Sequence, residues 1–94
     1  MTDHDPLIGQ LREQISDRDR AIVEAMNARL ELVARLKAHK DSLGLPFLDP
    51  DREERMFQEL SRVNRGPLST EGLRELLEQI LDLTKREVER ANSD

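Results

Sequence analysis

The chain has 94 residues, a formal charge of -5 at pH 7 and no cysteine, which excludes several kinds of site. Disulfides and thiolate zinc sites are impossible, and the two histidines, His4 and His39, are too scattered to indicate a metal site. The acidic balance and the presence of only two aromatic residues argue against nucleic-acid binding. No signal peptide or membrane span is recognisable. We therefore expect a single cytoplasmic domain, residues 1–94, without metal, nucleic acid or membrane as a partner.

Residues 7 to about 41 are predicted to form one long helix. Apolar or small side chains recur along it at steps of three, four and seven: Leu11, Ile15, Ile22, Ala25, Leu32 and Leu36. Gly44 suits a left-handed position past the helix end, and Pro46 favours an extended Leu45. Such a helix is about 50 Å long, whereas a compact domain of this size is roughly 32 Å across. We therefore expect the long helices of two copies to pack together as a homodimer; the alternative is a helix that kinks within a monomer.

Two shorter helices are predicted over about residues 50–64 and 70–90, so the fold class is all-α with three helices per chain. Asp49 can cap the second helix, with Pro50 at its first position and Asp51 near the positive end of its dipole. Ser69 or Thr70 is the expected cap of the third. The apolar stripe of the third helix consists of Leu73, Leu76, Leu77, Ile80 and Leu81, followed by Thr84.

Basic residues fall on the apolar face of the first helix. Arg29 and Lys40 are separated by steps of four, three and four that pass through two apolar residues, so both flank core positions. Arg12 lies one residue off this stripe, near the helix start. Buried cations without partners cost several kcal/mol, so these side chains either meet carboxylates or hold an anionic ligand. The simpler alternative is that Arg29 and Lys40 extend to solvent.

The other two helices also direct polar groups inward. Asp49, Arg52 and Glu53 lie close to one face of the second helix, and Thr84 lies one turn beyond Ile80 on the third. Simpler alternatives exist for each: surface pairing of Arg52 and Glu53, capping by Asp49, and a bond from Thr84 back to the Ile80 carbonyl. A cluster of polar groups from several helices nevertheless favours a ligand site. Because nucleophile and phosphate-loop motifs are missing, an enzyme of this kind would act by positioning and electrostatics on a small polyanion.

Three stretches, "LREQISDRDRAIVEAMNARLELVARLKAHK", "GLPFLDPDRE" and "NRGPLSTEGLRELLEQILDLT", cover nearly the whole chain and resemble the all-helical chorismate mutases. The matching features are Asp19 seven residues after Arg12, an arginine in the middle of the first helix, a lysine six residues before Pro46, and D-x-x-R-E at the start of the second helix. The resemblance implies an intertwined homodimer with two active sites, each taking one arginine from the neighbouring subunit. It also implies the cofactor-free Claisen rearrangement of chorismate to prephenate, on the route to phenylalanine and tyrosine.

The resemblance assigns the following roles. Arg29 and Arg12 of the partner subunit would clamp the substrate's carboxylates, which the arginine fork matches bidentately. Lys40 would hydrogen-bond the ether oxygen, where negative charge grows as the C–O bond breaks. Arg52 would lie near the site, and Glu53 would accept a hydrogen bond from the substrate's ring hydroxyl.

The third helix departs from the family at one position. Thr84 stands where the family often has serine, a donor to a substrate carboxylate, and Asp49 would help through its backbone or by capping. Four residues after Thr84 the family commonly has Gln or Glu as a second donor to the ether oxygen, but here the residue is Val88. Glu87 would have to be protonated to donate in its place, with activity then rising toward acidic pH. If Val88 faces the ether oxygen, we expect a slower enzyme that relies on Lys40.

Other functions are compatible with the same pattern. Isochorismate pyruvate-lyase activity on this fold also needs a cationic pocket and no cofactor. A noncatalytic helical module that regulates a pathway enzyme is a second alternative, and a coiled-coil adaptor is a third. A larger enzyme of the aromatic pathway is also a conceivable activating partner of this small chain.

Overall fold

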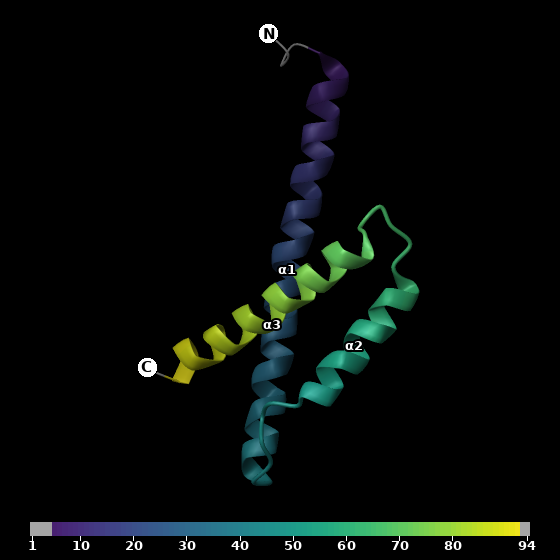
Figure 1. The fold of residues 1–94 in the computed structure, drawn as a ribbon. Helices are drawn as coiled ribbons and strands as arrows, with labels where there is room; N and C mark the ends of the chain where they lie inside the picture. Colours follow the sequence, from purple (N-terminus) through teal and green to yellow (C-terminus); the bar gives the residue numbers. More distant parts are fainter. Residues whose placement is uncertain (1–4, 93–94) are drawn as a thin grey trace. The chain divides into compact units, whose positions relative to one another are not determined.

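The computed structural model describes residues 5–92, and these form three α-helices joined by short loops (Figure 1). Helix α1 spans Pro6–Ser42, α2 spans Pro50–Val63 and α3 spans Thr70–Asn92. The predicted all-α fold with three helices is confirmed. His4 lies outside the described residues. None of the helices in the described range has the length and apolar character needed to cross a membrane.

The chain divides into two compact units, Met1–Leu32 and Val33–Asp94. The described part of the first unit is α1 up to Leu32. The second unit contains the end of α1, together with α2 and α3, which folds back after the loop over residues 64–69 (Figure 1). Most of the predicted site residues belong to this second unit.

Both α1 and α2 begin with an Asp-Pro pair. The Asp5 carboxylate accepts hydrogen bonds from the backbone N–H groups of Leu7, at 2.8 Å, and Ile8, at 3.4 Å. Pro6, which has no N–H to satisfy, occupies the first helical position. Asp49 is the N-cap of α2, as predicted, and is likewise followed by a proline. The cap at Asp5 was not predicted, although the sequence contains the same local signal there.

The end of α1 is closed by Gly44, whose φ of 69° lies in the left-handed region. The Leu45 N–H donates to the Lys40 carbonyl at 2.9 Å, and the Gly44 N–H donates to the Asp41 carbonyl at 3.2 Å. This pair of bonds is the Schellman motif, which satisfies carbonyls at a helix end. The predicted left-handed glycine is confirmed, and the motif holds the backbone of the turn that carries Lys40.

The loop between α2 and α3 is held by side-chain bonds to its own backbone. Asn64 donates from Nδ2 to the Leu68 carbonyl at 2.9 Å, and its Oδ1 accepts from the Gly66 N–H at 3.1 Å. The Ser69 hydroxyl accepts from the Gly72 N–H at 3.0 Å, so Ser69 rather than Thr70 caps α3. These bonds determine where α3 begins relative to the end of α2.

The apolar core of the second unit lies between α2 and α3. Phe57, Leu73 and Leu77 are buried, and Met56 and Ile80 pack against them. This is a small core for three helices. By contrast, no residue of α1 is buried within a single chain. The large apolar side chains of α1 that remain 41–66% exposed are Leu7, Leu11, Ile15, Ile22, Val23, Leu32 and Leu36.

An arginine covers one side of this core. The Arg74 guanidinium lies over the Phe57 ring, with Cζ 3.7 Å from the ring centroid, and its Nη2 is 3.4 Å from Glu54 Oε1. Stacking of a cation on an aromatic face is favourable, and the carboxylate balances its charge. The Arg74–Glu54 pair thus ties α3 to α2 on the solvent side of the core.

Candidate active site

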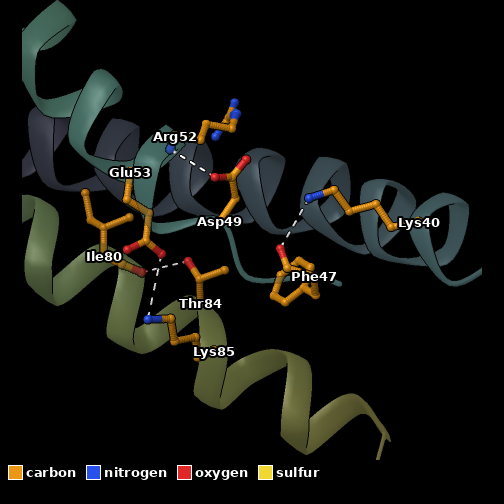
Figure 2. A network of polar contacts seen from close by, with 8 residues as sticks. All are labelled: Lys40, Phe47, Asp49, Arg52, Glu53, Ile80, Thr84 and Lys85. Atoms are coloured by element: carbon orange, nitrogen blue, oxygen red, sulfur yellow. Dashed lines mark hydrogen bonds and ion pairs between the residues drawn. The ribbon is translucent and has the colours of Figure 1, made fainter. Parts of the chain in front are cut away.

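Lys40 lies two residues before the end of α1 and is half-buried. Its Nζ donates a hydrogen bond to the Phe47 carbonyl at 3.3 Å, in the loop that leads to α2 (Figure 2). The ammonium group has three N–H donors, and Phe47 uses one of them. Lys37, one turn earlier, is paired with Asp41 at 2.7 Å. Of these two lysines, Lys40 is the one oriented by the loop.

The first turn of α2 carries three predicted site residues. Asp49 Oδ1 accepts from the Arg52 N–H at 3.1 Å, and the Asp49 carbonyl accepts from the Glu53 N–H at 3.1 Å. Capping, the simpler interpretation of Asp49, is therefore a role that the structure shows directly. The side chains of Arg52 and Glu53 leave α2 in different directions (Figure 2).

Arg52 belongs to an exposed groove along α2. The groove has a volume of about 410 Å³, and its lining residues are Arg52, Arg55, Met56, Gln58, Glu59 and Arg62. Three arginines give this surface a positive character that suits an anion. Within the second unit, the structure does not bring the side chains of Arg52 and Glu53 together, whereas the sequence analysis placed both close to one face of the helix.

Glu53 instead faces α3. Its Oε1 lies 3.7 Å from Lys85 Nζ, and the two side chains are 32% and 43% exposed, respectively (Figure 2). Lys85 was not among the residues predicted from the sequence. The available signal was its place directly after Thr84, at the end of the apolar stripe, but the pairing with Glu53 requires knowledge of how α2 packs on α3.

Thr84 is the buried polar side chain of the described core, with a relative exposure of 5%. Its hydroxyl donates to the Ile80 carbonyl one turn earlier, at 2.6 Å (Figure 2). This is the local alternative considered from the sequence, and it is common for threonine in helices. Because a hydroxyl carries one proton, Thr84 must rotate away from Ile80 before it can donate to a ligand.

The next turn of α3 contains Glu87 and Val88, both half-buried. Glu87 accepts a hydrogen bond from Arg90 Nη1, with the Arg90 nitrogen 2.8 Å from Glu87 Oε2. Because Arg90 already engages the Glu87 carboxylate, Glu87 would have to leave this contact before it could serve a ligand.

Arg12 and Arg29 belong to the first unit, where Arg12 is exposed and Arg29 is half-buried. They are 17 residues apart on the same helix, which corresponds to about 25 Å along the helix axis at 1.5 Å per residue. One copy of α1 therefore cannot direct both guanidinium groups at the same small ligand. A site that uses both arginines requires two copies of the helix.

No cluster of three or more His, Asp or Glu side chains suited to a metal ion occurs within residues 5–92. The arrangement in the second unit is a lysine from α1, a capped first turn of α2 with a carboxylate turned toward α3, and a buried hydroxyl on α3. Chemically, it offers hydrogen-bond donors and one acceptor to an anionic ligand. These features define an all-helical protein whose candidate site acts by hydrogen bonding and charge.

Comparison with known proteins identifies the family. Residues 11–89 match the family described as chorismate mutase type II, and the chain belongs to this family. The resemblance noted in the sequence is thereby confirmed.

Two solved structures of chorismate mutase from Thermus thermophilus are similar in both sequence and fold. Form I has a TM-score of 0.80 at 34% identity, and the match covers 82% of this chain and 96% of that one. Form II has a TM-score of 0.83 at 34% identity, with 88% and 94% covered. Nearly the entire length of each of these chains is therefore matched by the present three helices.

A curated relative is the bifunctional chorismate mutase/prephenate dehydratase of Aquifex aeolicus (strain VF5), which is 31% identical over 85 residues. The match covers 82% of this chain but 24% of the relative. The chain thus spans about a quarter of the length of that bifunctional protein.

Proposed function

We propose that this chain is a chorismate mutase, an isomerase that rearranges chorismate to prephenate. The observation that carries the proposal is the family match over residues 11–89, which includes Arg12, Arg29 and Lys40 as well as the polar groups of α2 and α3. In this intramolecular reaction the ether C–O bond breaks and a C–C bond forms, so no atom leaves. To catalyse it, the protein needs only to hold the substrate in a compact conformer and to stabilise negative charge on the ether oxygen.

Lys40 is the proposed donor to the ether oxygen. The Phe47 carbonyl orients its ammonium group, and the Schellman motif holds the backbone of its helical turn. Because the ether oxygen gains negative charge only as the C–O bond stretches, a hydrogen bond from Lys40 strengthens in the transition state. Such a bond raises kcat rather than merely tightening substrate binding.

Arg29 and Arg12 of the partner subunit are the proposed clamps for the two carboxylates. The axial separation of about 25 Å between these positions on one helix is the support for a site shared by two subunits. The seven large apolar side chains that α1 leaves exposed supply a second argument for association, since a partner helix could cover them. The proposed active form is a homodimer whose long helices pack together.

The proposed roles of the remaining residues follow from their contacts. Glu53, turned toward α3, accepts the hydrogen bond of the substrate's ring hydroxyl. Thr84 donates to a carboxylate after rotating away from Ile80, and Asp49 holds the first turn of α2 in place. Arg52 supplies positive charge at the edge of the site. With Val88 unable to donate and Glu87 paired to Arg90, the proposed enzyme depends on Lys40 at the ether oxygen.

The test is turnover of chorismate by the purified chain, followed as prephenate formation, with isochorismate assayed in parallel. We expect prephenate from chorismate. Pyruvate and salicylate from isochorismate, without prephenate from chorismate, would replace the proposal with the lyase activity. Absence of turnover with both substrates would point to a noncatalytic module.

A further inference from the structure

Two ion pairs that connect α2 with α3 involve adjacent glutamates. Glu54 pairs with Arg74, whose guanidinium also lies over Phe57. Glu53 pairs with Lys85, directly after the buried Thr84. The first pair covers the core and has an evident packing role, whereas the second lies where the proposed site residues of α2 and α3 meet.

From this placement we infer that Lys85 is a positioning residue that acts through the Glu53 carboxylate. This inference rests on the proposed function, in which Glu53 accepts the hydrogen bond of the substrate's hydroxyl. Nothing in the roles that the resemblance implied involves Lys85.

The first part of the argument is orientation. A glutamate side chain has several rotatable bonds, and ordering it costs conformational entropy. The Glu53 backbone is held by its N–H bond to the Asp49 carbonyl, but its carboxylate is restrained by the Lys85 ammonium at 3.7 Å. Because the two helices pack through Phe57, Leu73 and Leu77, the positions from which both side chains extend are stable. Lys85 therefore presents the Glu53 carboxylate in one region rather than letting it sample solvent.

The second part is charge. The substrate is a dianion, so a carboxylate in its binding site repels it. A cation beside Glu53 offsets this repulsion and still leaves carboxylate lone pairs available to accept a hydrogen bond. Lys85 thus allows an acidic acceptor to operate in a site built for an anion. Replacing it should weaken substrate binding more than it slows the bond rearrangement.

The decisive experiment is a double-mutant cycle on chorismate turnover with Lys85→Ala, Glu53→Gln and the double variant. We expect Lys85→Ala to raise KM about tenfold while kcat changes by less than about threefold, a size within the range measured for coupled neighbours. In the Glu53→Gln background, the same substitution should have almost no further effect. Lys85→Arg, which keeps the cation, should restore KM to within about threefold of the wild-type value.

Glu54→Gln is the matched control, because it weakens the neighbouring α2–α3 pair without touching a proposed site residue. Its KM and kcat should equal those of the wild type, and circular dichroism should show the same helix content for all variants. If Lys85→Ala has the wild-type KM, the inference about Lys85 is wrong, while the proposed function is unaffected. An equal loss in the Glu53→Gln background, or an equal loss in Glu54→Gln, would also overturn the inference, since either would mean that Lys85 acts on general packing. An inactive wild type would overturn the proposed function and the inference with it.

Discussion

The two units of this chain differ in how far their helices bury apolar side chains. In the second unit, α2 and α3 bury Phe57, Leu73 and Leu77 against each other and are linked by two ion pairs. In the first unit, α1 also carries recurring apolar side chains, although its amphipathic pattern is weaker than that of α2 or α3, and none of its residues is buried within the chain. In proteins, most of the stability of an amphipathic helix comes from the packing of its apolar face rather than from the helix propensity of its residues. The comparison teaches that α2 and α3 bury apolar side chains against each other within one chain, whereas those of α1 stay exposed, which supports the proposed homodimer.

The largest expected effect concerns the apolar face of α1. Ile15→Asp places a charge where each copy of a homodimer would bury an apolar side chain, at a cost of about 1.5–3 kcal/mol per copy for the lost burial alone. Since the substitution appears twice in a symmetric dimer, we expect the dissociation constant to rise by about 10²–10⁴. Sedimentation equilibrium measures this change.

Gln14→Asp is the control for that measurement, because it adds the same charge at the neighbouring position of α1 off the predicted apolar stripe. It should leave the association nearly unchanged. If Ile15→Asp associates as tightly as Gln14→Asp, the contrast between α1 and the other helices disappears, and the dimer proposal with it.

The next largest expected effect is the loss of chorismate turnover caused by Lys40→Ala. Removing one donor to a developing oxyanion typically lowers kcat by about 10²–10³, and we expect a loss of this order in chorismate turnover. Lys37→Ala, one turn earlier on the same helix, removes a cation that is paired with Asp41 and should retain activity within about threefold. Stopped-flow or steady-state assays of prephenate formation distinguish the two. Equal activity of the two lysine variants would refute the role of Lys40.

A mixing experiment sharpens the comparison between the units. Arg12→Ala and Arg29→Ala should each lower turnover by about 10² or more, since each removes a proposed charge-assisted hydrogen bond to a substrate carboxylate. If each site combines Arg29 with Arg12 of the partner subunit, a heterodimer of the two variants contains one intact site. When equal amounts of the two variants pair at random, half of the dimers are heterodimers, and each heterodimer has one working site out of two.

We therefore expect unfolding and refolding of the mixed variants to recover about a quarter of the wild-type activity, by random pairing of symmetric dimers. As the control, each variant refolded separately should recover almost none of the wild-type activity. Activity that stays at the level of the separate variants would show that both arginines come from the same chain.

The smallest expected effect is a pH dependence of stability within the α2–α3 pair. The side-chain hydrogen bond from Arg74, followed by that from Gln58, lowers the pKa of Glu54 below its usual value of 4.5. A depressed carboxyl pKa contributes stability above the unfolded-state pKa, and this contribution is lost as the pH falls through the folded-state pKa. Glu54→Gln should thus be slightly less stable than wild type near pH 6, and the difference should vanish well below pH 4.5.

Thermal unfolding followed by circular dichroism measures that difference, with Glu59→Gln on the same helix as the control. Glu59 is exposed, and its substitution gives the baseline against which the Glu54→Gln difference is read. A stability difference that widens as the pH falls would contradict the assigned ion pair.

The local features of the fold were largely predictable. Asp49 as a cap, Gly44 in the left-handed region and the approximate extents of the three helices follow from interactions between residues a few positions apart. Asp5 was missed even though the Asp-Pro signal is the same as at Asp49. By contrast, the Glu53–Lys85 contact joins residues on different helices, and no spacing rule predicts it. The divergent directions of Arg52 and Glu53 were not predicted, although adjacent residues on a helix point about 100° apart and the divergence could have been expected from that spacing.

The sequence by itself determined the three helices, the cap at Asp49, the turn at Gly44 and the family, because hydrophobic periodicity, capping residues and family motifs can all be read along the chain. The contribution of Arg12 by the partner subunit came from the family resemblance and stays a prediction. Only the tertiary structure decided that Arg74 stacks on Phe57, that Thr84 is buried with its proton directed at Ile80, and that Glu53 meets Lys85. The reason is physical: these contacts depend on the packing of α3 against α2, which brings together side chains that are distant along the chain.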